Sequence, residues 1–178
     1  MIKRLVPPLV FVVALVALAF VMQALGNSSP TEKTLTGPEL LKSFEIMEIA
    51  PPKATVTDKD GKQLDLGSLL TKPTFLTFWS IYCGECEIGL PVLDEFAKSQ
   101  SRVAVMMVSV KNEPKDVEEK LKALNITLGT YFDLDGSAAE SWEATTMPAS
   151  YYFVGGKLKY FFPGRVSKEH LDALLAVQ

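Results

Sequence analysis

The feature that most constrains the fold of this chain is an apolar run that leads directly into its two cysteines. Residues 74–80 (TFLTFWS) are mostly β-branched and aromatic, which is typical of a strand covered on both faces. Cys83 and Cys86 follow, and apolar residues then recur at helical spacing as far as Ala97. A second apolar run at 102–110 predicts a neighbouring parallel strand, reached through a right-handed crossover. The pattern therefore predicts a strand–helix–strand unit with the cysteines at the start of its helix.

The rest of the chain continues to alternate between strand and helix patterns. Pro114 opens a helix that Asn125 can close, and Gly155-Gly156 between two apolar runs is typical of a tight hairpin. Strands that alternate with helices, followed by a closing hairpin, predict an α/β protein with a mixed central sheet between helical layers, a three-layer α/β/α arrangement. The further elements expected are a short helix within 39–49, a hairpin over 54–64, a helix from 114, a brief strand at 131–132, a short helix at 137–142, strands at 150–154 and 157–161, and a last helix capped by Ser167.

The N-terminus carries a long apolar segment without charge. Residues 5–25 would span roughly 31 Å as a helix, close to the ~30 Å of a bilayer's hydrocarbon core. Lys3 and Arg4 precede the segment and the next basic residue is Lys33, so the positive-inside bias leaves the N-terminus in the cytoplasm. We therefore predict a signal anchor, a membrane-spanning helix, over 1–25.

This segment also determines the predicted domain organisation and location. A linker that begins with turn-forming residues is expected over 26–50, and a folded domain over 51–178. The domain is predicted to be extracytoplasmic (periplasmic), held at the cell membrane by a single-pass helix. A cleaved signal peptide is the alternative, because Ala24 and Gly26 are small residues at the positions that a signal peptidase inspects. Cleavage would leave the domain free in the periplasm or secreted.

Charge and cysteine content argue against two classes of protein. Removing Lys3 and Arg4 from the 18 basic residues leaves 16 against 21 acidic ones, a net charge of −5, which gives no reason to expect binding to nucleic acid. Exported proteins tend to oxidise their cysteines into structural bridges, but two cysteines in 178 residues do not make a disulfide framework.

The cysteine pair has three possible explanations: a structural metal site, a structural staple and a redox pair. A structural metal site needs four ligands, and the chain offers the two cysteines and His170, which is expected on the surface of the last helix. A structural staple is a poor account, because closing a four-residue loop contributes about 2 kcal/mol, against ~4.7 kcal/mol for a 100-residue loop. A redox pair fits the location, since the first turn of a helix favours the thiolate of Cys83 and places Cys86 one turn along on the inward face. A C-x-x-C motif at a strand-to-helix junction therefore indicates a redox function.

The residues around this motif resemble the thioredoxin superfamily. The resemblance rests on Phe78-Trp79-x-x-Tyr82-Cys83-x-x-Cys86, on Pro91 after it, and on Met147-Pro148 ahead of the strand hairpin. The N-terminal anchor, the stretch TDKDGKQLDLGSLL and the extra helix and strand within 114–132 are similar, more narrowly, to the TlpA/ResA-like membrane-anchored thiol-disulfide oxidoreductases. The resemblance extends from Pro51 to the C-terminus.

The resemblance implies a thioredoxin-like fold and a reversible dithiol/disulfide couple, with no further cofactor. Cys83 would be the attacking cysteine and Cys86 the resolving one. The implied partners are protein thiol/disulfide substrates, such as apocytochrome c or copper-site proteins that must be kept reduced, a membrane electron donor, and the lipid bilayer around the N-terminal helix. The implied supporting or substrate-binding residues are Trp79, Tyr82, Glu85, Met147 and Pro148.

Each supporting residue has an expected place. Trp79 and Tyr82 would line the rim of the site, although Trp79 would equally suit the core. Pro148 would be a cis-proline beside the sulfurs, and the Met147 backbone would pair with an extended substrate. Glu85 would tune the site or select a partner, unless it is simply solvated.

The chain departs from the family pattern at three places near the cysteines. The spacer Gly84-Glu85 lacks the proline that is common in the family. Thr77 stands where thioredoxins carry a buried acid, and Gly89 stands where the cytochrome-maturation branch often has a glutamate. The usual proton acceptor therefore has no counterpart at these positions.

Two effects compete at Cys83 and determine the expected direction of the reaction. The helix N-terminus stabilises the thiolate by up to ~1–2 kcal/mol. Glu85 and Glu87 oppose it, because a carboxylate ~7 Å away at an effective dielectric of ~40 costs roughly 1 kcal/mol. No basic residue follows Cys86 to shift this balance, so only mild acidification is predicted. Strong oxidants of this fold owe their potential to a very stable thiolate, and a reductant or mild exchanger is therefore favoured.

A copper chaperone or other metal-binding protein on a thioredoxin-like scaffold is the alternative function. Such proteins typically space their cysteines by three residues and add a histidine in the late loops. This chain has two residues between its cysteines and no histidine in those loops.

Overall fold

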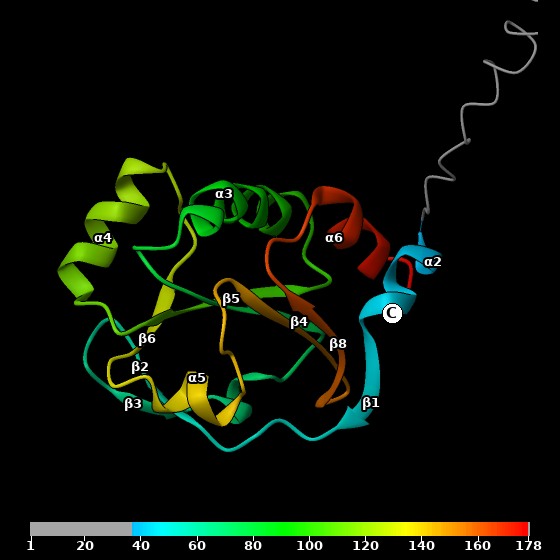
Figure 1. Ribbon diagram of the computed structural model, residues 1–178, viewed down its shortest axis with the longest axis horizontal. Helices are drawn as coiled ribbons and strands as arrows, with labels where there is room; N and C mark the ends of the chain where they lie inside the picture. The colour runs from blue at the N-terminus through cyan, green and yellow to red at the C-terminus, as the bar shows by residue number, and fades with distance from the viewer. Residues whose placement is uncertain (1–36, 178) are drawn as a thin grey trace, which may run out of the picture. The chain divides into compact units, whose positions relative to one another are not determined.

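The computed structural model describes residues 37–177, in which eight strands form one sheet with helices on both faces (Figure 1). The predicted membrane-spanning helix over 1–25 lies outside the described residues, and within 37–177 no helix is long and apolar enough to span a bilayer. The strands are β1 Glu45–Ile49, β2 Thr55–Thr57, β3 Gln63–Asp65, β4 Thr74–Trp79, β5 Ala104–Val110, β6 Thr130–Asp133, β7 Ala149–Val154 and β8 Lys157–Pro163. The helices are α2 Pro38–Leu41, α3 Gly84–Ser99, α4 Pro114–Ala123, α5 Ser137–Ser141 and α6 Lys168–Leu174, with 3₁₀ turns at Lys42–Phe44 and Gly67–Leu69.

The sheet is mixed, and its order β1-β8-β7-β4-β5-β6-β2-β3 brings the predicted strand–helix–strand unit to the centre. β4 runs parallel to β5, with Thr74 opposite Ala104, and β5 runs parallel to β6. β7 is antiparallel to both β4 and β8, and the β7–β8 hairpin turns at Gly155 and Gly156 with positive φ angles of 60° and 75°. The predicted α/β fold with a mixed sheet is confirmed.

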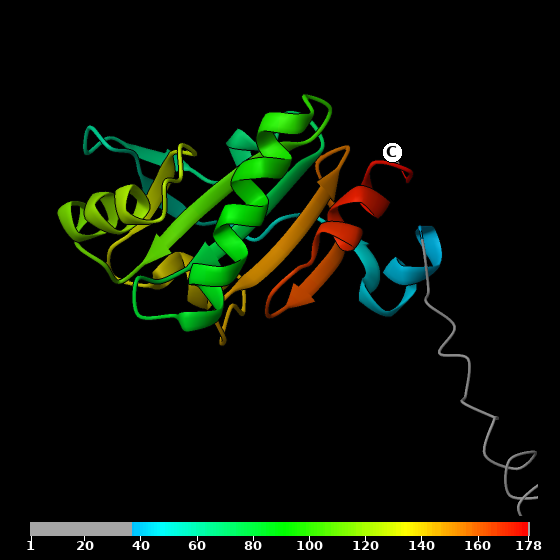
Figure 2. The ribbon, with the colours of Figure 1, turned by 90° about the horizontal axis from the view of Figure 1, so that it is seen from above.

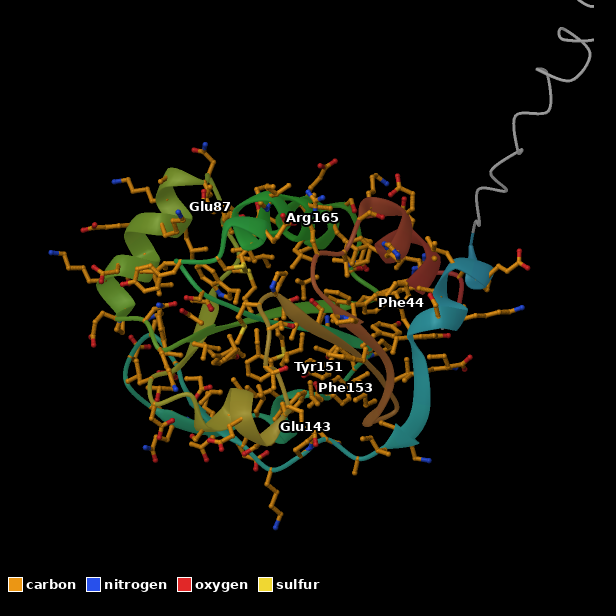
Figure 3. All side chains as sticks on the ribbon, viewed as in Figure 1. Phe44, Glu87, Glu143, Tyr151, Phe153 and Arg165 are labelled. Carbon is orange, nitrogen blue, oxygen red and sulfur yellow. A yellow bond between two sulfur atoms is a disulfide. The ribbon has the colours of Figure 1, made fainter. Side chains whose placement is uncertain are left out.

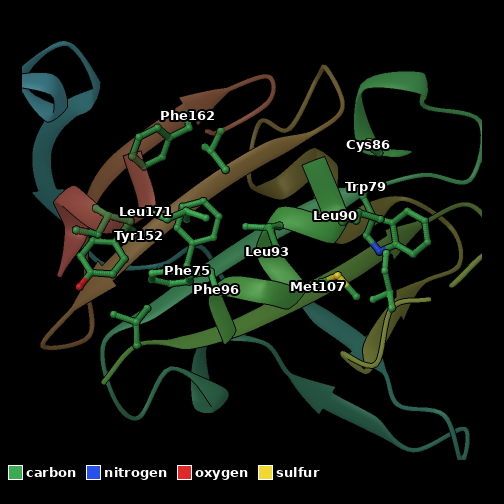
Figure 4. Packing of buried hydrophobic residues seen from close by; sticks show 14 of the residues in the cluster. Phe75, Trp79, Cys86, Leu90, Leu93, Phe96, Met107, Tyr152, Phe162 and Leu171 are labelled. Carbon is green, nitrogen blue, oxygen red and sulfur yellow. The ribbon is translucent and has the colours of Figure 1, made fainter. Parts of the chain in front are cut away.

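The two faces of the sheet bury separate apolar clusters. α3 and α6 lie side by side over one face (Figure 2), where Leu90 and Leu93 of α3 pack with Phe75 of β4. Figure 4 shows this cluster, which also contains Cys86. The other face, next to α5, buries aromatic side chains that include Phe153. Since burying one large apolar side chain contributes about 1.5–3 kcal/mol, the first of these clusters positions α3 firmly on β4 and β5.

The segment before Pro51 differs from the prediction. The helix expected within 39–49 is limited to α2 and the 3₁₀ turn that follows it, and residues 45–49 instead form β1, which pairs with β8. The sheet thus takes up residues assigned to the predicted linker over 26–50. Pairing with β8 satisfies backbone groups of residues 45–49 that a helix would have satisfied internally. The pattern of apolar residues in this segment does not distinguish a helix from an edge strand.

His170 does not lie on the surface as predicted. Its imidazole is half-buried and makes edge contacts with the stacked rings of Phe44 and Phe162, whose centroids lie 5.1 and 5.9 Å away. The Nδ1 atom lies 3.2 Å from the backbone nitrogen of Ser167, which begins α6. Burial lowers the pKa of His170, so the neutral form is favoured and the residue stabilises the start of α6.

Candidate functional site

The two cysteines form a disulfide at the beginning of α3. Cys83 is the N-cap residue, and its Sγ accepts a hydrogen bond of 3.1 Å from the backbone N–H of Cys86. The sulfurs differ in environment: Cys83 is half-exposed, whereas Cys86 is only 1% exposed and packs in the core with Leu90 (Figure 4). The pair thus consists of one sulfur that a partner can reach and one that is shielded.

The loop between β4 and α3 is fixed by a residue that follows the neighbouring strand β5. Asn112 follows β5, and its side-chain oxygen accepts hydrogen bonds from the backbone N–H of Ile81 and the hydroxyl of Ser109, at 3.1 and 3.0 Å. Because β4 and β5 are parallel, their carboxyl ends meet at one edge of the sheet, and Asn112 is buried there. Sequence reasoning did not identify Asn112. A polar residue just after the apolar run at 102–110 is the signal in the sequence that could have indicated it.

Pro148 lies next to the disulfide, and the Met147–Pro148 bond is cis. Pro148 and Cys86 line one cavity of about 10 Å³, together with Thr77 and Ser150. The hydroxyls of Thr77 and Ser150 are buried and lie 2.9 Å apart in a hydrogen bond. A pair of hydroxyls thus occupies the position where the family pattern has a buried acid, and no carboxylate is among the described residues that line this cavity.

Trp79 and Tyr82, both expected on the rim, have opposite environments. Tyr82 is 84% exposed beside Cys83 and is free to contact a partner. Trp79 is 1% exposed, and its indole Nε1 donates a 3.2 Å hydrogen bond to the hydroxyl of Thr130. Trp79 is therefore a core residue beneath the site and not part of its exposed rim, because β4 is covered on both faces at this position.

The two glutamates that follow Cys83 are each paired with a cation from a distant part of the chain. Arg165, from the segment between β8 and α6, lies with its Nε 3.3 Å from Oε2 of Glu85. Lys120 of α4 forms an ion pair with Glu87. Both Arg165 and Glu87 lie on the α3 side of the sheet (Figure 3). The expectation that no basic residue offsets the two carboxylates is therefore wrong, because tertiary structure supplies cations that the local sequence lacks.

One buried carboxylate anchors the other end of α3. Asp94 accepts hydrogen bonds from the backbone N–H groups of Thr127 and Leu128, at 3.0 and 2.9 Å, and pairs with Lys98 at 2.5 Å. Burial alone would raise the pKa of Asp94, but these donors outweigh it and hold the pKa below its ordinary value. Asp94 therefore ties α3 to the loop that leads into β6.

Comparisons with known proteins agree with this geometry. The sequence profile of the AhpC/TSA family matches residues 47–161. The chain is 26% identical over 136 residues to "Thiol-disulfide oxidoreductase ResA" of Bacillus thuringiensis, covering 74% of this chain and 79% of the relative. It is 31% identical over 116 residues to "Thioredoxin-like protein" of Haemophilus influenzae, covering 65% of this chain and 69% of the relative. The crystal structure of a secreted Mycobacterium tuberculosis disulfide oxidoreductase homologous to E. coli DsbE superimposes with a TM-score of 0.63 at 21% identity, covering 71% of this chain and 96% of that one, which shows a shared fold.

Proposed function

The chain belongs to the AhpC/TSA family and is a protein thiol-disulfide oxidoreductase, and on this premise we propose that it reduces or exchanges disulfides of other proteins outside the cytoplasm. The observation that supports this proposal most directly is the unequal exposure of a bonded pair, with Cys83 accessible and Cys86 buried. An attacking thiol must reach the partner's disulfide, and a resolving thiol must stay shielded until the mixed disulfide has formed. The two environments suit these two roles.

The reaction starts from the dithiol form. The Cys83 thiolate attacks one sulfur of the partner's disulfide, and a Cys83–partner bond forms while the other partner sulfur leaves as a thiolate and takes up a proton. Cys86 then gives up its proton and attacks Cys83, which forms the intramolecular disulfide and releases the second partner sulfur. Two electrons pass from the protein to the partner. We assign the proton of Cys86 to the second partner sulfur, which leaves as Cys86 attacks. No carboxylate is found among the described residues that line the cavity beside Cys86 and could take this proton instead.

The charges around Cys83 support a reductant or a mild exchanger. The helix N-terminus favours the thiolate, while Glu85 with Arg165 and Glu87 with Lys120 sum to no net local charge. A strongly oxidising member of this fold needs a very stable thiolate, which this environment does not supply. Electrons would then come from a dithiol donor in the membrane.

The sequence supports a proposed location and proposed substrates. The apolar segment 5–25 supports anchoring in the cell membrane with residues 37–177 on the extracytoplasmic side. The resemblance to TlpA/ResA-like proteins supports partners such as apocytochrome c or copper-site proteins, whose cysteines must be reduced before they bind haem or copper. Exposed Tyr82 and the cis-linked Met147–Pro148 segment offer a surface on which an extended partner segment would lie.

The equilibrium with glutathione tests the direction of the reaction. We expect the full chain, purified in detergent, to show a reduction potential below about −180 mV, on the reducing side of protein disulfide isomerase. A value near −120 mV, typical of DsbA, would contradict the reductant role. Absence of any exchange with glutathione would contradict the oxidoreductase role itself.

Trapping of the mixed disulfide tests the class of substrate. In Cys86→Ser the attack on a partner proceeds but cannot be resolved, so partners should accumulate as dithiothreitol-sensitive adducts on Cys83 in the native membrane. The double variant Cys83→Ser/Cys86→Ser is the matched control and should hold none. An apocytochrome or a copper-site protein among the adducts supports the assignment, and adducts that include neither would overturn it.

A further inference from the structure

We propose that Arg165 is a positioning residue that sets the acidity of the Cys83 thiol, and through it the reduction potential of the pair. This inference rests on the proposed function, because it concerns the regulation of the same two sulfurs. Arg165 acts through Glu85, whose carboxylate it pairs with, and it would not itself contact the reacting sulfur of a partner. The backbone of Arg165 is held beside the disulfide, its stem packs on α3, and its guanidinium offsets the charge of Glu85.

The backbone of Arg165 is tied to the cis-proline segment. The N–H of the preceding Gly164 donates a 2.8 Å hydrogen bond to the carbonyl oxygen of Pro148. Gly164 has a φ of 91°, a conformation that favours glycine, and it directly follows the end of β8. The β7–β8 pairing, with Ala149 opposite Pro163, therefore delivers Arg165 to the side of the disulfide.

The stem of Arg165 packs across α3 at a position without a side chain. A Cβ atom built on Gly89 would lie 3.3 Å from Cγ of Arg165, closer than most such contacts allow. Arg165 also lines the cavity that Cys86 and Pro148 share. A glycine inside a helix costs about 0.5–1 kcal/mol relative to alanine, and here it leaves the space that the arginine stem occupies. The arginine stem therefore lies in the space next to Gly89 that a side chain at this position would share.

The guanidinium offsets Glu85, the acidic residue that lies nearest to Cys83 along the chain. Glu85 and Arg165 are paired at 3.3 Å with side-chain exposures of 60% and 45%, so the pair itself adds little to stability. The titratable and charged groups near Cys83 are Glu85 and Glu87 on its own helix, Lys120 from α4, Arg165, and Tyr82 and Cys86. Since Lys120 pairs with Glu87, Arg165 is the cation that offsets Glu85, the second residue after Cys83.

Removal of the positive charge has a predictable sign. In Arg165→Met the stem remains, but the Glu85 carboxylate then faces the Cys83 thiolate without a counter-charge. The thiolate becomes less stable, the pKa of the thiol rises, and the dithiol form becomes a stronger reductant. Glu85→Gln should act in the opposite direction, and adding Arg165→Met to Glu85→Gln should have little further effect, as expected if Arg165 acts through Glu85.

The experiment measures thiolate absorbance against pH and the equilibrium constant with glutathione for the full chain in detergent. We expect Arg165→Met to shift the equilibrium roughly three- to tenfold toward the disulfide and the thiolate titration to higher pH. The shift should shrink in high salt, because the pair is exposed. Arg165→Lys, which keeps the charge, should lie between Arg165→Met and the wild type.

Arg102→Met is the matched control, since Arg102 lies beyond the far end of α3 and its guanidinium contacts the carbonyl oxygen of Leu175. It changes the net charge equally and should leave both readouts unchanged. Equal behaviour of Arg165→Met and Arg102→Met would overturn the inference while the proposed function stands. If the wild type itself does not exchange with glutathione, the proposed function fails instead. Should Arg165→Met not fold, Glu85→Gln and Arg165→Lys decide the matter by their opposite signs.

Discussion

The two halves of α3 are held in contrasting ways. The N-terminal half presents Cys83 and Ile88 to solvent, and its acidic side chains form exposed ion pairs with distant cations. The C-terminal half is fixed by Asp94, a buried carboxylate whose oxygens accept hydrogen bonds from Thr127, Leu128 and Lys98. Exposed pairs contribute ~0–1 kcal/mol each, whereas buried hydrogen bonds to a charged group contribute ~1.5–3 kcal/mol.

The contrast separates stability from reactivity along one helix. The end that must meet a partner is stabilised mainly by Cys86 and Leu90 beneath it, and its charges adjust the sulfur without being needed for folding. The other end carries the polar anchor. Substitutions in the first half should therefore change chemistry at nearly constant stability, and substitutions at Asp94 should do the reverse.

The largest effect is expected at the reactive sulfur. Cys83→Ser should lower the reduction of a protein disulfide by at least ~1,000-fold, because the attacking thiolate is lost. Its thermal midpoint should match that of the dithiol wild type, since the side chain is half-exposed and serine differs from cysteine by a single atom. Turnover with dithiothreitol as electron donor and thermal unfolding in the same reductant measure both quantities. A variant that keeps substantial turnover, or that unfolds well below the wild type, would break the comparison.

The second-largest effect is expected at Asp94, the buried carboxylate that ties α3 to the loop before β6. Asp94→Ala should lower the free energy of unfolding by roughly 2–4 kcal/mol, because it leaves the N–H groups of Thr127 and Leu128 without their acceptor. Lys98→Ala is the control, since it removes only the more exposed partner and should cost below ~0.5 kcal/mol. Urea denaturation measures both, and the glutathione equilibrium should be unchanged. Equal losses in the two variants would argue against the anchor.

The anchor also predicts how stability depends on pH. The folded-state pKa of Asp94 lies below its ordinary value of 3.8, so its contribution is fully present above that value and is lost as pH falls through the folded-state pKa. The urea midpoint of the wild type should therefore fall on acidification below pH ~4, and Asp94→Ala should show less of this fall. Parallel curves for the two proteins would exclude Asp94 as the source.

The same contrast explains what could be predicted from the sequence. The strand of residues 74–79, the helix of 84–99 and the cysteine pair at their junction depend on local periodicity and on residue type, and all were expected. The pairing of Glu85 with Arg165 joins segments 80 residues apart, and it depends on the register of β7 with β8. No local pattern contains that register.

Two further failures have the same physical origin. β1 was read as part of a helix because its pairing with β8 is a long-range contact of an edge strand. The resemblance implies a rim position for Trp79, with the core as an equal alternative, and the rim position fails because the pleat of β4 directs the side chain to the core, where Thr130 accepts its N–H. Gly89 offered a usable signal, since a glycine inside a helix often marks the space that a neighbour needs.

The smallest effect is expected for an exposed apolar side chain, Ile88, in the N-terminal half of α3. Ile88 is 53% exposed one turn and a half after Cys83, and with Tyr82 it makes up two of the four strongly exposed large apolar side chains described within 37–45 and 49–177. Ile88→Ser should slow the reduction of a protein disulfide roughly three- to tenfold, because the side chain would be covered by the partner, while oxidised glutathione should react at the wild-type rate. Ile49→Ser, at the β8-paired edge of the sheet, is the matched control and should alter neither rate. An equal loss of rate with the protein disulfide and with glutathione would mean that Ile88 affects the thiol chemistry itself. An unchanged rate with both would mean that a protein partner does not cover Ile88.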